Sequence, residues 1–166
     1  MNQTKAFGLT ALFFVSVQSS LAGGYLREYL TAGPHLKKQL SVSIWSVQDR
    51  SYVGTIWNIL EDGGYTIAPF IDKTVKPARK AGTLKAKDIE KLAGIMAHDS
   101  FLDIYPRLNG WADRPDTFVT VSFGDRAVTL GGRGEISIEQ EESDHRKRLE
   151  SIVEKVQHVL ESAGEH

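Results

Sequence analysis

The chain has 166 residues, with 20 basic and 21 acidic side chains, five histidines and no cysteine. Its nearly balanced charge disfavours nucleic acid as a partner. The absence of cysteine excludes disulfides, thiolate metal sites and cysteine nucleophiles, so packing must stabilise the fold.

The N-terminus has the pattern of a signal peptide. Lys5 precedes an apolar run over residues 6–17, and the small residues of Ser20-Leu21-Ala22 follow. The run is shorter than the roughly 20 apolar residues that a spanning helix needs. The predicted division is a signal peptide over residues 1–22, an N-terminal extension over residues 23–39 and a single domain over residues 40–163. We expect a soluble, exported protein in the periplasm or outside the cell, with no integral membrane segment.

The first part of the predicted domain has the pattern of β-strands. Apolar and small polar residues alternate from Leu40 to Ile44, as in a half-buried strand. Two β-branched and aromatic runs, at residues 55–60 and 65–70, flank Asp62-Gly63, a pair that favours a tight hairpin turn. Because Pro69 lacks a backbone N–H, the second run is expected to end there or to lie at an edge. Residues 72–82 are expected to form a cationic connector.

Two amphipathic helices are also predicted. The first, over residues 86–97, places Ile89, Leu92, Ala93 and Met96 on one face. The second carries an apolar stripe of Leu149, Ile152, Val153, Val156 and Leu160, with Ser143 as its N-cap. Between the helices, residues 101–104 are expected to pack under the sheet, and alternation over residues 117–130 predicts a second hairpin. Together these elements predict an α+β fold in the order β-β-β-α-β-β-α, an antiparallel sheet of two hairpins with two helices on one face.

One long loop is the main candidate for binding. Residues 105–116 contain Tyr105, Arg107, Trp111 and Arg114, residue types that are enriched in binding hot spots. Loops of this length without secondary structure are commonly functional. The alternative is that Trp111 folds back to cover an edge of the sheet. Trp45 and Trp57 lie in predicted strands and are expected in the core or on a sheet face.

Candidate catalytic and metal-binding residues are sparse. The sequence has no pair of histidines one helical turn apart and no Gly-x-Ser-x-Gly motif, so we expect no metal, no cofactor and no catalytic residue. One alternative is a small periplasmic hydrolase that uses His98 with Asp99 or Asp103. Such a site would require these side chains to open into one concave pocket.

A basic segment offers a third alternative. Lys73, Lys76, Arg79, Lys80, Lys85 and Lys87 lie within 15 positions of one another. From Lys73 to Lys87 the chain could hold an anionic partner in the cell envelope by electrostatic attraction. A solvated connector is the simpler interpretation in a chain of balanced charge.

The order of short motifs resembles emfourin-type domains, small proteinaceous inhibitors of thermolysin-like metalloproteases. The matching segments are Leu40 to Trp45, Leu84 to Asp88, Phe101-Leu102 and Pro115-Asp116-Thr117-Phe118 followed by residues 119–130. The resemblance spans residues 40–160 and implies a protease inhibitor rather than an enzyme. The chain departs from the family at residues 46–54, where Gln48, Asp49 and Arg50 replace paired glycines, and by an insertion at residues 71–82. No inhibitory residue is transferred.

The leading hypothesis is therefore an exported binding module whose partner is a protein such as an exported protease. The predicted contacts are the turn at residues 46–54, with Asp49 and Arg50, and the loop at residues 105–116.

Overall fold

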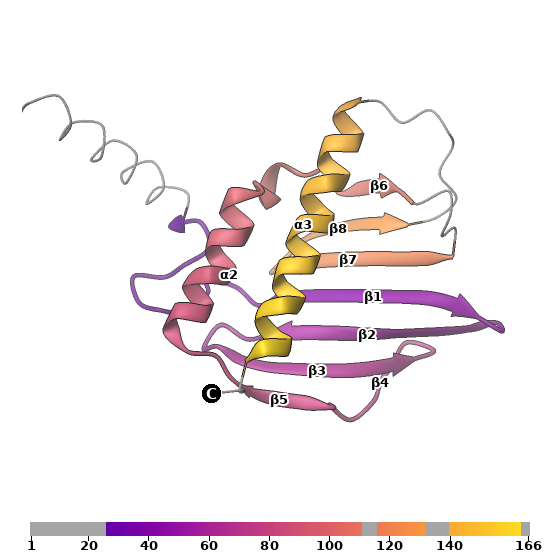
Figure 1. Ribbon diagram of the computed structural model, residues 1–166, viewed down its shortest axis with the longest axis horizontal. Helices are drawn as coiled ribbons and strands as arrows, with labels where there is room; N and C mark the ends of the chain where they lie inside the picture. The colour runs from indigo at the N-terminus through magenta and orange to yellow at the C-terminus, as the bar shows by residue number, and fades with distance from the viewer. Residues whose placement is uncertain (1–25, 111–115, 132–139, 164–166) are drawn as a thin grey trace, which may run out of the picture.

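The computed structural model describes residues 26–110, 116–131 and 140–163, which form a sheet with two helices on one face (Figure 1). The described elements are β1 (Leu40–Gln48), β2 (Ser51–Ile59), β3 (Gly64–Ile71), β4 (Thr74–Val75), β5 (Lys80–Thr83), α2 (Ala86–His98), the 3₁₀ helix η1 (Phe101–Asp103), β6 (Arg107–Asn109), β7 (Thr117–Phe123), β8 (Arg126–Gly131) and α3 (Gln140–Ser162). The predicted α+β class is confirmed, as is the placement of both helices on one face of the sheet.

The eight strands follow the order β4-β3-β2-β1-β7-β8-β6, with β5 also paired to β3. All pairs are antiparallel except β6 with β8. The β2–β3 and β7–β8 hairpins were predicted. The predicted element order is incomplete, because β4 and β5 form within the expected connector and β6 forms within the expected loop.

The first hairpin is longer than the sequence pattern indicated. β1 and β2 pair continuously from Leu40 opposite Ile59 to Gln48 opposite Ser51. The predicted turn at residues 46–54 therefore reduces to Asp49 and Arg50. Most of those positions belong to strands because the backbone ladder continues to the last residue before the turn.

Pro69 lies inside β3 rather than at its end. β5 pairs with β3 up to Ile67, and β4 begins pairing at Phe70. The carbonyl of Pro69 accepts a hydrogen bond from the N–H of Lys76 (2.8 Å). The position therefore faces the gap between β4 and β5, where the missing N–H interrupts no ladder.

The second helix begins earlier than expected. α3 starts at Gln140, so Ser143 lies inside it rather than at its cap. Acidic residues near the start of a helix interact favourably with its dipole. Glu142 also holds β6 in place, because its carboxylate accepts hydrogen bonds from the N–H (2.7 Å) and side-chain amide (3.2 Å) of Asn109.

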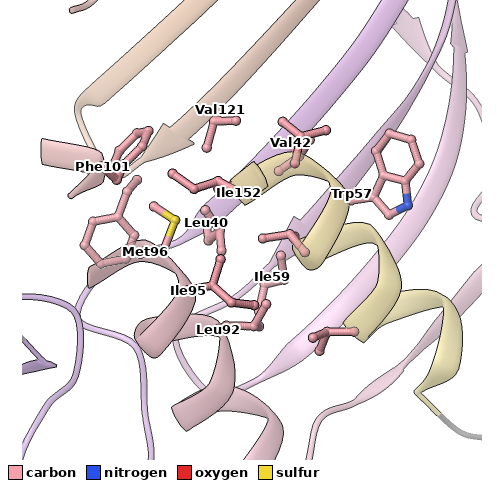
Figure 2. Packing of buried hydrophobic residues seen from close by; sticks show 14 of the residues in the cluster. Leu40, Val42, Trp57, Ile59, Leu92, Ile95, Met96, Phe101, Val121 and Ile152 are labelled. Carbon is pink, nitrogen blue, oxygen red and sulfur yellow. The ribbon is translucent and has the colours of Figure 1, made fainter. Parts of the chain in front are cut away.

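The core lies between the helices and the sheet. Leu40, Val42, Trp57 and Ile59 point from the sheet toward apolar residues of α2 and α3 (Figure 2). The predicted stripes of both helices are buried: Ile89, Leu92, Ala93, Met96, Leu149, Ile152, Val153, Val156 and Leu160. Burial of these side chains supplies the main favourable free energy of folding.

Segments outside the main elements complete this core. Tyr29 and Leu36, from the expected N-terminal extension, are buried in the same cluster, and Tyr29 packs on Phe123 with 5.3 Å between ring centres. Burial raises the pKa of Tyr29 to about 12. Phe101 and Ile104 pack under the sheet as predicted, whereas Leu102 is exposed.

Within the described residues, no helix has both the length and the apolar character needed to cross a membrane.

Two glycines, one in the sheet and one in α2, differ in the space around them. A Cβ at Gly54 would lie 2.3 Å from the backbone oxygen of Ile44 and 2.5 Å from the Cβ of Trp45, whereas a Cβ at Gly94 in α2 would meet no atom within 4 Å. Gly54→Ala is expected to lower the free energy of unfolding by about 1–3 kcal/mol through overpacking. Gly94→Ala is expected to raise it by about 0.5–1 kcal/mol through helix propensity. Chemical denaturation measures both changes, and equal effects would contradict the packing described.

Candidate functional site

Two tight turns lie at the end of the sheet that extends beyond α3 (Figure 1). Asp49 and Arg50 join β1 to β2 with φ of 48° and 70°, and Asp72 and Lys73 join β3 to β4 with φ of 49° and 66°. Two-residue turns with positive φ match the twist of the strands they connect. We call residues 47–52 and 71–75, which contain both turns, the hairpin corner.

Hydrogen bonds join the two turns into one unit. The backbone N–H of Tyr52 donates to the side-chain carboxylate of Asp72 (3.0 Å), and the N–H of Asp72 donates to the carbonyl of Tyr52 (2.8 Å). The ammonium of Lys73 lies 5.8 Å from the centre of the Tyr52 ring. A cation at this distance over an aromatic face is attracted to it. Contacts between the two turns therefore hold the hairpin corner together.

Exposed apolar side chains gather at the hairpin corner. Val47, Tyr52, Ile71 and Val75 are 39%, 38%, 41% and 56% exposed. Elsewhere in the described chain, the large apolar side chains that are similarly exposed are Leu60, Leu102 and Tyr105. An exposed apolar group rimmed by charged residues commonly marks an interaction site.

An aromatic cluster supports the corner from the sheet face opposite the helices. The rings of Tyr52 and Trp45 meet edge to face at 5.2 Å, and Trp45 stacks on Phe118 at 4.1 Å with an interplanar angle of 12°. Such pairs add about 0.5–1.5 kcal/mol beyond their buried area. Tyr52 is therefore held by neighbours on both sides. Trp57, the other tryptophan in a predicted strand, has its side chain buried in the core.

The predicted binding loop is divided by the fold. Arg107 begins β6, and the ring of Tyr105 stacks on His145 of α3 at 4.0 Å. In the sheet order, two strands, β7 and β8, separate β6 from β1 and its turn. The other end reaches the corner, because the carbonyl of Asp116 accepts a hydrogen bond from the N–H of Val47 (3.1 Å). Trp111 and Arg114 lie outside the described residues.

The basic segment does not form a single patch. Arg79 makes an ion pair with Glu161 of α3 (2.8 Å), and the ammonium of Lys80 donates to the backbone carbonyl of the same residue. Lys73 lies at the hairpin corner, and Lys85 precedes the first residue of α2. The basic side chains are thus distributed over separate parts of the surface.

His98 and Asp99 lie in a hydrogen-bonded group between the two helices. The carboxylate of buried Asp99 contacts the imidazole Nδ1 of His98 (3.0 Å), the hydroxyl of Ser151 (2.9 Å) and the ammonium of Lys155 (3.2 Å). Desolvation raises the pKa of Asp99, but the three hydrogen bonds together outweigh it and hold the pKa below its usual value.

The order of contacts in this group differs from that of a serine catalytic triad. Activation of a serine requires the imidazole to lie between the hydroxyl and the carboxylate, whereas here the carboxylate of Asp99 lies between Ser151 and His98. Asp103 is exposed in η1. The hollows outlined between α3 and the sheet (about 180 Å³), near the start of α2 (about 310 Å³) and on the opposite sheet face (about 360 Å³) are lined by other residues. Asp99 therefore acts as a clamp between α2 and α3.

Within the described residues, no three histidine or carboxylate side chains converge as a metal site would require.

Comparison with known protein families found no matching family model, and comparison with curated proteins found no match.

The clamp makes stability depend on pH. Asp99→Asn is expected to lower the free energy of unfolding by about 1–3 kcal/mol near neutral pH, because charge-assisted hydrogen bonds are lost. The folded-state pKa is depressed, so the contribution is fully present above the unfolded value of about 4 and is lost as the pH falls through the folded value. The difference between the two proteins should therefore shrink toward acidic pH.

Urea denaturation at neutral pH and near pH 3 measures this difference, with exposed Asp103→Asn as the control. A difference that stays constant with pH would show that the carboxylate charge of Asp99 is not involved.

Proposed function

We propose that the protein is a non-catalytic binding module that contacts a protein partner through the hairpin corner. The observation that carries this proposal is the group of exposed apolar side chains around the two turns, Val47, Tyr52, Ile71 and Val75. Apolar and aromatic residues flanked by charges are typical of protein interfaces. Two polar groups elsewhere in the described chain make contacts between elements of the fold: Asp99 bonds Ser151 of α3, and Arg79 pairs with Glu161.

The backbone of the corner supports the same proposal. Arg50 and Lys73 have positive φ, a conformation that costs roughly 1–2 kcal/mol for a residue with a Cβ and little for glycine. Strained residues persist where the surrounding structure holds them, and they cluster at binding sites. A cation instead of glycine at this position of each turn is consistent with a surface that contacts a partner.

The narrower proposal is inhibition of a thermolysin-like metalloprotease, as the resemblance to emfourin-type domains implies. A braced two-residue turn loses little conformational freedom on binding, which favours insertion into a cleft. Asp49 and Arg50, the expected contact residues, stand at the tip of the longest hairpin in the described chain.

Arg50→Gly separates binding from folding. The substitution removes the cation and relieves the positive-φ strain, so thermal stability should stay equal or rise while inhibition of a thermolysin-like protease weakens about 10- to 100-fold. The measurement is the inhibition constant with a peptide substrate, alongside the melting temperature. Lys91→Ala, on an exposed position of α2, is the matched control and should change neither.

If the wild-type protein leaves thermolysin-like proteases uninhibited, the inhibitor form of the proposal is wrong. The broader form is then tested by capture from native envelope extract on immobilised protein, with mass spectrometry. Loss of a specific partner with Arg50→Gly and with Tyr52→Ala, but not with Lys91→Ala, would support the corner. Equal capture by all four proteins would contradict it.

A further inference from the structure

Over β1, β2, β3, β7 and β8, the sheet face opposite the helices carries no charge, and Arg107 of β6, which pairs with Thr129, lies at the edge of this face. Strand register assigns to this face four positions each from β1, β2 and β3 and three each from β7 and β8, eighteen in all. They are Ser41, Ser43, Trp45, Val47, Tyr52, Gly54, Ile56, Asn58, Gly64, Thr66, Ala68, Phe70, Phe118, Thr120, Ser122, Ala127, Thr129 and Gly131. None is Lys, Arg, Asp or Glu. Arg126, the one charged residue in these five strands, belongs to the helix-facing set and bonds the carbonyl of Ile104.

This composition differs from the rest of the protein. A quarter of the chain is charged (25%), and the solvent side of α3 carries side chains such as Glu154 and Lys155. A sheet face that remains in water commonly carries charges, which also prevent unwanted association. The uncharged positions of these five strands thus lie on a face that no described helix covers (Figure 1).

Aromatic residues and glycines lie in a row across this face and determine its surface shape. A row crosses five strands, from Phe70 through Gly54, Trp45 and Phe118 to Gly131. The rings lie over the glycines, since a Cβ at Gly54 would be 2.6 Å from Phe70 and a Cβ at Gly131 would be 2.2 Å from Phe118. Beyond the row the face consists mainly of small serine, threonine and alanine side chains, which allow another sheet to approach closely.

We propose that a second copy of this chain covers the face, so that two sheets pack against each other in a symmetric dimer. The eighteen uncharged positions of two copies meet without like-charge repulsion and without burying an unpaired ion, whereas a charged partner would find no complementary group among them. Stacked sheets lie about 10 Å apart with interdigitating side chains. Eighteen positions approach the roughly 20–30 residues that each side of a stable interface contributes. Isologous dimers are the commonest closed assembly.

Ser43 lies at the centre of the face. β1 is the middle one of the five strands, and Ser43 pairs with Ile56 on one side and Thr120 on the other. In a twofold arrangement about this centre, the two copies of Ser43 approach each other. The face shares Val47 and Tyr52 with the hairpin corner, but its centre lies away from the two turns. Ser43→Lys at the centre and Arg50→Gly at the turn therefore test the two proposals separately.

Oligomeric state tests the proposal directly. Light scattering after size-exclusion chromatography should give twice the mass of one chain at about 100 µM, a concentration well above a micromolar Kd. Ser43→Lys buries two like charges and should raise the dimer Kd about 100-fold or more. Gly94→Lys adds the same charge in open space on α2 and should leave the dimer intact. Melting temperatures verify that both variants fold.

A cysteine-free chain also permits a positive test. Ser43→Cys should form an intermolecular disulfide on mild oxidation, whereas Gly94→Cys should not. A monomeric wild-type protein, a dimer that survives Ser43→Lys, or equal cross-linking of both cysteine variants would overturn the proposal. Arg50→Gly should leave the mass unchanged; dissociation by that variant would place the interface at the turns instead.

Discussion

The fold depends on one-sided burial of the sheet. Leu40, Val42, Trp57 and Ile59 pack on α2 and α3, and the opposite face receives no described helix. Apolar burial has no direction of its own, so the alternation of side chains along each strand decides which face becomes the core. Because α3 crosses only part of the sheet, the far ends of β1, β2 and β3 do not pack on it. Backbone ladders, turns and aromatic contacts stabilise these ends instead.

Much of the fold could be predicted because it rests on periodicity. Leu40 and Val42 of β1 and the stripes of α2 and α3 repeat at the spacing that burial demands, and these residues are buried. Short strands cannot be predicted from periodicity. β4 has two residues and β6 three, lengths at which no alternation can be recognised, and both are held by neighbours in space. The start of α3 was also not predicted, because its first turn is polar and resembles a loop in sequence. The hydrogen bond from Asn109 to Glu142 in this turn is formed only in the folded structure.

The candidate site was less predictable than the fold. Asp49 and Arg50 were expected to contact a partner, but the turn that carries them was placed too broadly, since Asp-Arg and Asp-Lys are not the glycine-containing pairs that normally announce such turns. Exposed Tyr52 fell within the predicted turn at residues 46–54, and Ile71 and Val75 fell within the predicted insertion at residues 71–82. Only the register shows that they meet, and the one available signal was the repeated pattern of aspartate followed by a cation between β-branched runs.

Placing the first strand at the middle of the sheet shapes how the chain folds. β1 meets β2 after two residues, but its other edge waits for β7, which follows α2 and β6 in sequence. Pairings between distant segments form slowly, because loop closure precedes any gain from contacts. Until β7 arrives, the β1–β3 meander presents an open, uncharged edge. The time that β7 takes to pair with β1, in addition to final stability, is therefore expected to influence how readily the chain aggregates during refolding.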